Sequence, residues 1–375
     1  MPLRRLLLAL PLLLLAACGG SGSGGSDPDG DAPRDDGPAI GVLTGRVVEA
    51  VADAPLANVS LTLTRVDGNE SRLATGMSAA DGSYRFDALP IGGRYRIDHA
   101  LESYRTESYT DIVIAGGEEA ATRTLEPVRL VSNDNAGSGS LAGAITSAVD
   151  GEPLGGLLLE FRRGINARTG EIVATARTAA DGSYAVAGLE YGNLTCVITG
   201  DGFATTYTTV VALGGVDRID QDAAVSPRVD TGDTRIVLTW GERPRDLDAH
   251  LTGPGAAGET PFRVYFANKQ ADVAVLDLDD TASFGPETVT VDASRSGTFR
   301  YSVYNYSGDG GGRLAESGAR VQVLRPEGVV ADVFVPRGEG DLWTVFDLID
   351  GEILPVNTIS RRSSNDDHFA PETLR

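Results

Sequence analysis

The chain has 375 residues, of which 41% are hydrophobic and 6% aromatic, and its formal net charge is -21 from 53 acidic and 32 basic residues. This length predicts two or three domains with packed cores. The strongly acidic balance disfavours nucleic acid and anionic lipid as partners and favours cations or basic surfaces, although negative charge also keeps exported proteins soluble.

The N-terminus has the pattern of an export signal. Arg4 and Arg5 precede an apolar run that ends at Leu15 and is too short to span a bilayer. The Leu-Ala-Ala-Cys run that ends at Cys18 resembles the bacterial lipobox, in which the cysteine is lipidated and becomes the first mature residue. The resemblance implies a signal peptide over residues 1–17 and a membrane anchor at Cys18. Because Gly19 follows it, the resemblance favours the outer membrane of the cell envelope; an ordinary signal with an incidental cysteine is the alternative.

Residues 18–39 are small, polar and acidic, so we expect a flexible tether that cannot bury enough apolar surface to fold. Cys196 is the only other cysteine. If Cys18 is acylated, no intramolecular disulfide is possible, and Cys196, in a strand-like run, is expected to be a buried thiol.

The next two segments, 40–131 and 139–227, are copies of one pattern. Both consist of short alternating runs separated by turn residues, without an amphipathic helix of useful length. The sequence Ala-Ala-Asp-Gly-Ser-Tyr occurs at 79–84 and again at 179–184. An Asp-Gly turn before alternating hydrophobic residues predicts a β-hairpin, and the repetition predicts two domains of the same fold.

Each copy resembles the carboxypeptidase regulatory-like domain, a transthyretin-like sandwich of seven strands. The resemblance rests on a Gly-x-Val start, a later Pro-Leu, and an Asp-Gly-x-Tyr-x-Phe-x-x-Leu box that begins at Asp81 and Asp181. In the second copy Val186 replaces the Phe. The family is mostly non-catalytic, so the two aspartates are expected to form turns and not to bind a ligand.

Residues 233–357 predict a third sandwich of nine short strands, followed by a disordered polar tail over 358–375. Its Trp-Gly, Asp-Leu-Asp-Ala-His-Leu, Leu-Asp-Leu-Asp-Asp-Thr, Phe-Gly-Pro-Glu and Tyr-Ser-Val-Tyr-Asn-Tyr runs resemble the YfaP-like exported β-domains of bacteria. That family has no established activity. The chain as a whole is therefore expected to be all-β, with three tandem sandwiches.

The third sandwich also holds the candidate site. Asp246, Asp248 and His250 alternate with apolar residues, which places them on one face of a strand, and Asp277 with Asp279 repeats the pattern. If these strands lie side by side, their carboxylates converge and could bind calcium, which prefers oxygen ligands. The candidate metal ligands are Asp246, Asp248, Asp277, Asp279, Asp280 and Glu287. Pairing of these acids with Arg243, Arg245 and Arg263 at a solvated rim is the competing interpretation.

No motif for catalysis has the context that it needs, because the Gly-x-Ser-x-Gly run at 20–24 lies in the tether. We therefore predict a non-catalytic, membrane-anchored protein of the cell envelope whose third sandwich binds a protein or glycan, with His250, Tyr304 and Tyr306 as candidate ligand contacts. An envelope scaffold without a dedicated ligand is the alternative. A metal-assisted hydrolase at Asp246, Asp248 and His250 is a third hypothesis.

Overall fold

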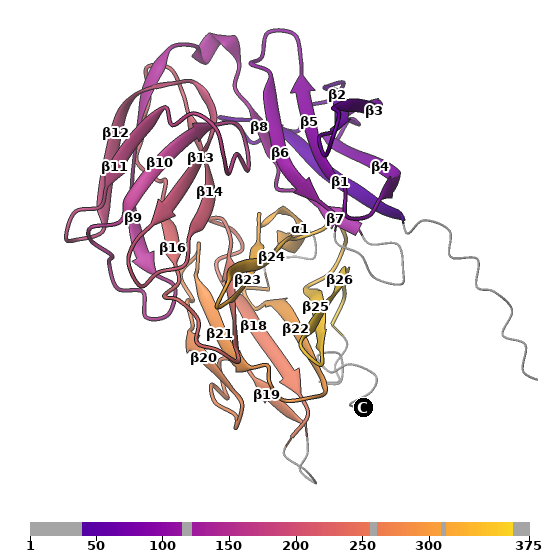
Figure 1. Cartoon of the computed structure of the whole chain (residues 1–375), viewed down its shortest axis with the longest axis vertical. Coiled ribbons are helices and arrows are strands. Elements are labelled where there is room, and N and C mark those ends of the chain that lie inside the picture. The colour runs from indigo at the N-terminus through magenta and orange to yellow at the C-terminus, as the bar shows by residue number, and fades with distance from the viewer. Residues whose placement is uncertain (1–39, 115–121, 256–260, 309–312, 363–375) are drawn as a thin grey trace, which may run out of the picture. The chain divides into compact units, whose positions relative to one another are not determined.

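The computed structural model describes residues 40–114, 122–255, 261–308 and 313–362. These residues form six sheets that pair into three two-sheet sandwiches, which confirms the predicted all-β class (Figure 1). The export signal, Cys18 and the tether lie outside the described residues. Within the described ranges, no helix has the length and apolar character needed to cross a membrane.

The first sandwich is organised by β1 (Ile40–Glu49), which pairs antiparallel with β4 and parallel with β7 and β8. The opposing sheet has the strand order β3-β2-β5-β6. Its side chains alternate between core and solvent, and Tyr95 and Ile97 of β5 are fully buried. The other strands are β2 (Ser60–Arg65), β3 (Ser71–Met77), β4 (Ser83–Pro90), β5 (Arg94–Ala100), β6 (Glu107–Val113), β7 (Thr122–Thr124) and β8 (Val128–Leu130).

The second sandwich repeats this topology. Its β9 (Ser138–Ser147) pairs antiparallel with β12 and parallel with β15 and β16, and the opposing sheet has the order β11-β10-β13-β14. Cys196 lies in its core, as expected. A short 3-10 helix, η1 (Asn133–Asn135), lies directly before β9 in the chain. The other strands are β10 (Leu158–Arg163), β11 (Ala174–Arg177), β12 (Ser183–Glu190), β13 (Gly192–Thr199), β14 (Thr206–Ala212), β15 (Asp217–Arg218) and β16 (Ala223–Val225).

The two Asp-Gly turns have the same local structure. Asp81 Oδ1 accepts hydrogen bonds from the Ser83 backbone N–H at 3.0 Å and from its hydroxyl at 2.6 Å, and Asp181 does the same with Ser183 at 3.1 and 2.6 Å. The glycine that follows Asp81 has a φ of 77°, which residues with a side chain rarely adopt. Both aspartates therefore hold turns.

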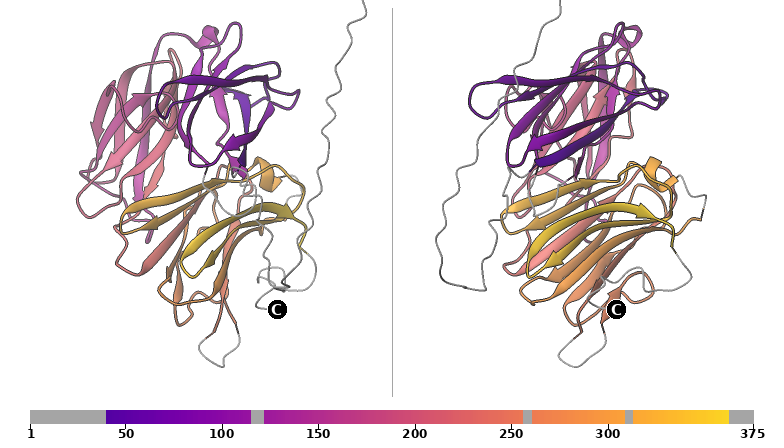
Figure 2. Two further views of the ribbon diagram at one scale, coloured as in Figure 1. Left: turned by 45° about the vertical axis from the view of Figure 1, so that its right-hand side comes forward. Right: turned by 90° about the vertical axis from the view of Figure 1, so that its right-hand side faces the viewer.

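The third sandwich packs a sheet of order β20-β21-β17-β23-β24 against one of order β19-β18-β22-β25-β26. Figure 2 shows these two sheets face to face. Trp343, Tyr301, Phe299 and Phe346 are the largest fully buried side chains of the core between them. The elements are β17 (Asp233–Thr239), β18 (Leu247–Gly253), β19 (Phe262–Val264), β20 (Ala274–Leu278), β21 (Glu287–Asp292), β22 (Thr298–Asn305), α1 (Arg313–Glu316), β23 (Arg320–Arg325), β24 (Gly328–Phe334), β25 (Leu342–Ile349) and β26 (Glu352–Ser360).

This sandwich has ten strands in its described part, one more than predicted. The additional strand, β26, pairs with β25 up to Ser360, so residues 358–360 belong to the sandwich and not to the predicted tail. β26 is an edge strand with Pro355 inside it, and because proline lacks a backbone N–H for the ladder, this run does not have the usual pattern of a strand. The tail beyond residue 362 lies outside the described residues.

Candidate functional site

The candidate site lies at β18, where both faces of the strand are buried. Leu247, Ala249 and Leu251 belong to the core between the sheets. The alternating Asp248 and His250 are also buried, at 3% and 1% exposure, which does not fit the competing interpretation of acids paired at a solvated rim. The prediction of one acidic face was right in its periodicity, but a strand pattern does not show whether such a face is buried.

Three carboxylates converge here from both sheets. Asp246 directly precedes β18 and Asp248 lies on it, whereas Glu287 begins β21 of the opposing sheet. One oxygen from each of the three lies within 4.8 Å of the others. Glu287 Oε2 also accepts a hydrogen bond of 2.6 Å from the Ala249 backbone N–H. We call Asp246, Asp248 and Glu287 the acidic cluster; it could bind a metal.

The other three predicted metal ligands are not part of this group. A register shift between Leu276 and Leu278 puts a bulge at Asp277, whose carboxylate accepts a hydrogen bond of 2.6 Å from the Thr290 hydroxyl. Asp279 lies beyond the end of β20 and forms an ion pair of 2.7 Å with Lys269, although it is close enough to the group to interact with the side chain of Glu287. Asp280 accepts from the Ala282 backbone N–H at 2.6 Å.

The condition that the two acidic strands lie side by side in one sheet is not met. The strands β18 and β20 belong to opposing sheets, so the acids of the cluster meet across the sandwich. Sheet order depends on contacts between residues far apart in the chain, which alternation within one strand does not contain.

Burial dominates the electrostatics of the acidic cluster. Together with the charges of Asp246 and Asp279, it raises the pKa of Asp248 to about 7. Burial also raises the pKa of Asp246 and takes that of Glu287 well above its usual value; the hydrogen bond from Ala249 opposes the latter shift. Each carboxylate is thus costly to ionise unless a positive charge lies beside it.

Arginines supply that charge only in part: Arg245 lowers the pKa of Asp246, and Arg263 and Arg362 lower that of Asp248, but burial outweighs them. None of the ion pairs in the described part of the chain involves a member of the acidic cluster. Arg263 instead donates from Nε to His250 Nδ1 at 3.1 Å and stacks over the Tyr265 ring at 4.3 Å. Burial, with the charges of Arg263 and Arg362, takes the pKa of His250 well below its usual value, so this imidazole is neutral and its proton is on Nε2.

Aromatic side chains lie beside the acidic cluster. The His250 ring stacks on Tyr265 with centroids 5.4 Å apart, and Tyr265 contacts Phe266 edge to face at 5.1 Å. Phe266 then contacts Tyr306 at 5.2 Å, and these two rings are 37% and 54% exposed. With Tyr304, whose ring meets His250 at 6.3 Å, they form what we call the aromatic surface: Tyr265, Phe266, Tyr304 and Tyr306.

Two of these four rings were predicted as ligand contacts, and Tyr265 with Phe266 were missed. On a continuous strand, the neighbouring side chains of Tyr265 and Phe266 would point to opposite faces. The strand β19, however, ends at Val264. A chain that has left the strand can turn both rings toward one surface, and no local pattern indicates this.

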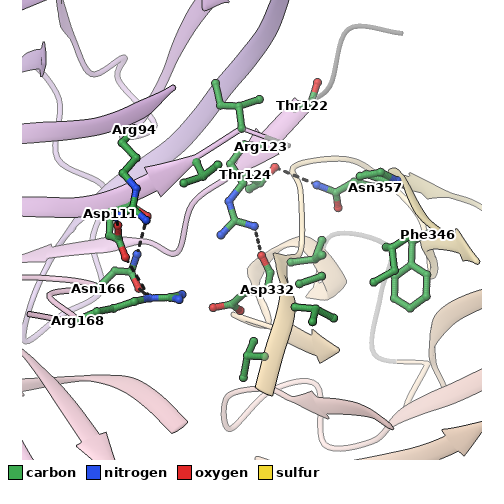
Figure 3. A pocket seen from close by; sticks show the side chains of 18 residues that line it. Arg94, Asp111, Thr122, Arg123, Thr124, Asn166, Arg168, Asp332, Phe346 and Asn357 are labelled. Atoms are coloured by element: carbon green, nitrogen blue, oxygen red, sulfur yellow. Dashed lines mark hydrogen bonds and ion pairs between the residues drawn. The ribbon is translucent and has the colours of Figure 1, made fainter. Parts of the chain in front are cut away.

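A separate pocket of about 330 Å³ is lined by residues of all three sandwiches (Figure 3). Its charges are compensated within the chain. Arg123 donates to the Asp332 backbone carbonyl, and Asp111 forms ion pairs with Arg94 at 2.7 Å and with Arg168 at 3.5 Å. These contacts explain the polar lining without a ligand.

Comparison with known proteins identifies one family. Residues 42–126 match the carboxypeptidase regulatory-like domain, which supports the resemblance of the first copy. No curated protein is similar enough to the chain to match it.

Solved structures with partial similarity include three bacterial proteins. A streptococcal ancillary pilin is 15% identical, over 51% of this chain and 63% of its own, with a TM-score of 0.21. The minor pilin GBS52 of Streptococcus agalactiae is 14% identical, over 51% and 97%, and the TIE protein of Bacillus anthracis is 14% identical, over 70% and 45%, both also with a TM-score of 0.21. At such scores the folds agree too little for any function to be transferred.

Proposed function

We propose that the chain is a non-catalytic, lipid-anchored protein of the cell envelope whose third sandwich binds a protein or glycan ligand. The observation that carries this proposal is the aromatic surface, where Phe266 and Tyr306 expose large rings side by side. Aromatic rings are enriched at the centres of binding interfaces because they bury much apolar area and lose little conformational entropy. A purely charged surface would have favoured a scaffold without a ligand.

The first two sandwiches serve in this proposal as spacers between the membrane and the binding sandwich. The family match of the first copy and the shared topology of the second support this role. The resemblance of residues 233–357 to YfaP-like exported domains adds the expectation of export. The net charge of -21 makes nucleic acid an unfavourable partner.

In this proposal a lipid on Cys18 anchors the protein in the membrane. Loss of this lipid should therefore change the location of the whole protein. Cys18→Ser removes the acceptor thiol, so the protein should move from the membrane fraction to the soluble fraction of the cells. Cys196→Ser, which leaves the lipobox intact, is the matched control and should remain with the membranes. A Cys18→Ser protein that still sediments with membranes would contradict the anchor.

Calcium is the metal that we assign to the acidic cluster. Calcium takes carboxylate oxygens at about 2.4 Å, so two of its ligands lie at most about 4.8 Å apart. The spacing of the cluster fits this limit. Magnesium requires a near-ideal octahedron and usually keeps several waters, whereas calcium accepts a flexible set of six to eight oxygen ligands, which suits carboxylates that come from two different sheets.

A glycan array and a pull-down from envelope extracts, both with the full chain in mild detergent, test the binding proposal. Phe266→Ala and Tyr306→Ala should each weaken a captured ligand at least tenfold, since a central aromatic side chain contributes about 2 kcal/mol or more to an interface. Ile219→Ala, which removes a side chain that is exposed on the second sandwich, should have no effect. Binding that is absent, or unaffected by both aromatic substitutions, would favour the scaffold.

A further inference from the structure

The acidic cluster is placed to join the two sheets of the third sandwich. Asp246 and Asp248 lie at the N-terminal end of β18, and Glu287 is the first residue of β21 in the opposing sheet. The strand β19 pairs only with residues 251–253 of β18, and the Glu287 side chain reaches the Ala249 N–H beyond that point. An ion bound by all three carboxylates would therefore hold the sheets together at this end.

Three oxygen atoms of the cluster point to a ligand. Asp246 Oδ1, Asp248 Oδ2 and Glu287 Oε1 accept no hydrogen bond, nor does Oδ1 of Asp279 beside Glu287, and the three cluster residues are 5%, 3% and 1% exposed. Buried polar atoms are almost always paired, because an unpaired one loses its hydration without compensation. Three such atoms, one from each member of a single cluster, indicate a shared positive partner. A divalent cation satisfies all three at once and removes the repulsion between the carboxylates.

The same residues also hold the aromatic surface. Asp248 is opposite Tyr304 in the ladder between β18 and β22. The Asp246 backbone N–H donates to the Ser307 hydroxyl at 2.7 Å, and Ser307 directly follows Tyr306. A shift of the β18 end would thus move Tyr304 and the Tyr306–Ser307 segment together.

We propose that a divalent cation in the acidic cluster joins the two sheets and fixes the aromatic surface, so that ligand binding by this surface depends on the ion. This inference rests on the proposed binding function for its biological meaning. Its physical content, an ion that restrains β18 and the Tyr304–Ser307 segment, is tested with the metal alone. Failure of the ion link and failure of ligand binding are therefore separate results.

The test is hydrogen exchange of the full chain in calcium chloride, in chelator, and in sodium chloride of equal ionic strength. Openings that release the ion should become rarer by the factor 1 + [ion]/Kd, which is about 100-fold at an ion concentration of about 100 times Kd. Calcium should slow exchange in residues 247–250 and 303–307 by this factor and leave the first two sandwiches unchanged. Sodium chloride should not reproduce the effect.

Asp248→Asn and Glu287→Gln keep the side-chain shapes and remove one charge each. Both should abolish the calcium effect, because an amide cannot supply a charged ligand atom, yet in chelator both should exchange no faster than the unsubstituted protein, because neither has a buried carboxylate to ionise. Having two variants keeps the test valid if one of them does not fold. Asp277→Asn, at an acid of the same sandwich outside the cluster, should retain the full calcium effect.

Two results would overturn the proposal: unchanged exchange in 10 mM calcium, or protection that survives both cluster substitutions. Protection of residues 247–250 without protection of 303–307 would overturn the link to the aromatic surface. Equal protection by magnesium would support the site and contradict the choice of calcium.

Discussion

The aspartates of the two Asp-Gly turns and those of the acidic cluster show two opposite uses of one side chain. Asp181 lies at the surface, and its carboxylate accepts two hydrogen bonds from Ser183, which lower its pKa. Asp248 is buried, has an oxygen without a partner, and has a raised pKa. The first carboxylate is satisfied by its own turn, whereas the second requires something that the described residues do not supply. Local hydrogen bonding therefore separates a structural acid from a candidate ligand better than charge or sequence pattern does.

The largest loss of folding stability is expected when the glycine of an Asp-Gly turn is replaced. This substitution tests how far the turn depends on a backbone conformation that only glycine adopts easily. An alanine Cβ at Gly82 would lie 2.3 Å from the Val47 carbonyl oxygen, at a φ of 77°. Gly82→Ala should therefore lower the free energy of unfolding of the first sandwich by on the order of 3 kcal/mol. Gly68→Ala is the control, because its φ of 85° is similar but its Cβ would meet no atom within 4 Å. It should cost only about 1 kcal/mol in chemical denaturation; equal losses would show that the contact is unimportant.

A third kind of carboxylate, buried but paired, sharpens the comparison. Glu107 accepts a hydrogen bond of 3.0 Å from the Asn193 N–H and lies 3.7 Å from Arg105 Nε. Burial nevertheless raises its pKa to about 7. The folded state then binds the proton more tightly than the unfolded state, so stability is highest below the ordinary pKa of glutamate and is lost as the pH rises through about 7.

Glu107→Gln should remove this dependence. The amide oxygen can still accept from Asn193, and no charge has to be buried at high pH. The variant should gain on the order of 2 kcal/mol relative to the unsubstituted protein between pH 5 and 8, as measured by denaturant unfolding at both values. A constant difference across this range would mean that Glu107 is ionised in the folded protein even at low pH.

The smallest effect is expected at the aspartate of the turn. Asp181→Asn retains an acceptor for Ser183 and should leave Tm nearly unchanged, whereas Asp181→Ala loses both hydrogen bonds and should lower it slightly. Because the pKa of Asp181 is lowered in the folded state, its contribution is present above the ordinary pKa of aspartate and is lost as the pH falls. Thermal melts should thus show a larger difference between Asp181→Ala and the unsubstituted protein at pH 7 than at pH 3.

These contrasts also show what could be predicted from sequence. The repeats and the all-β class follow from local signals, since Asp-Gly turns and alternation act within a few residues. The members of the acidic cluster were among the predicted acids for the same reason. Their separation from Asp277 was not predictable, because a bulge in β20 moves that carboxylate to Thr290. Neither was the meeting of Asp248 with Glu287, which depends on how two sheets are stacked.

The thiol of Cys196 has a practical consequence. It is 1% exposed in the second sandwich, and burial raises its pKa to about 12. Alkylating reagents attack the thiolate, so the folded second sandwich should be almost inert to them, and labelling should proceed only through opening. If Cys18 carries a lipid, Cys196 is the only free thiol of the chain. Each alkylated Cys196 then reports one opening of the second sandwich. The labelling rate gives its opening kinetics without an introduced probe, while the sandwiches on either side remain silent.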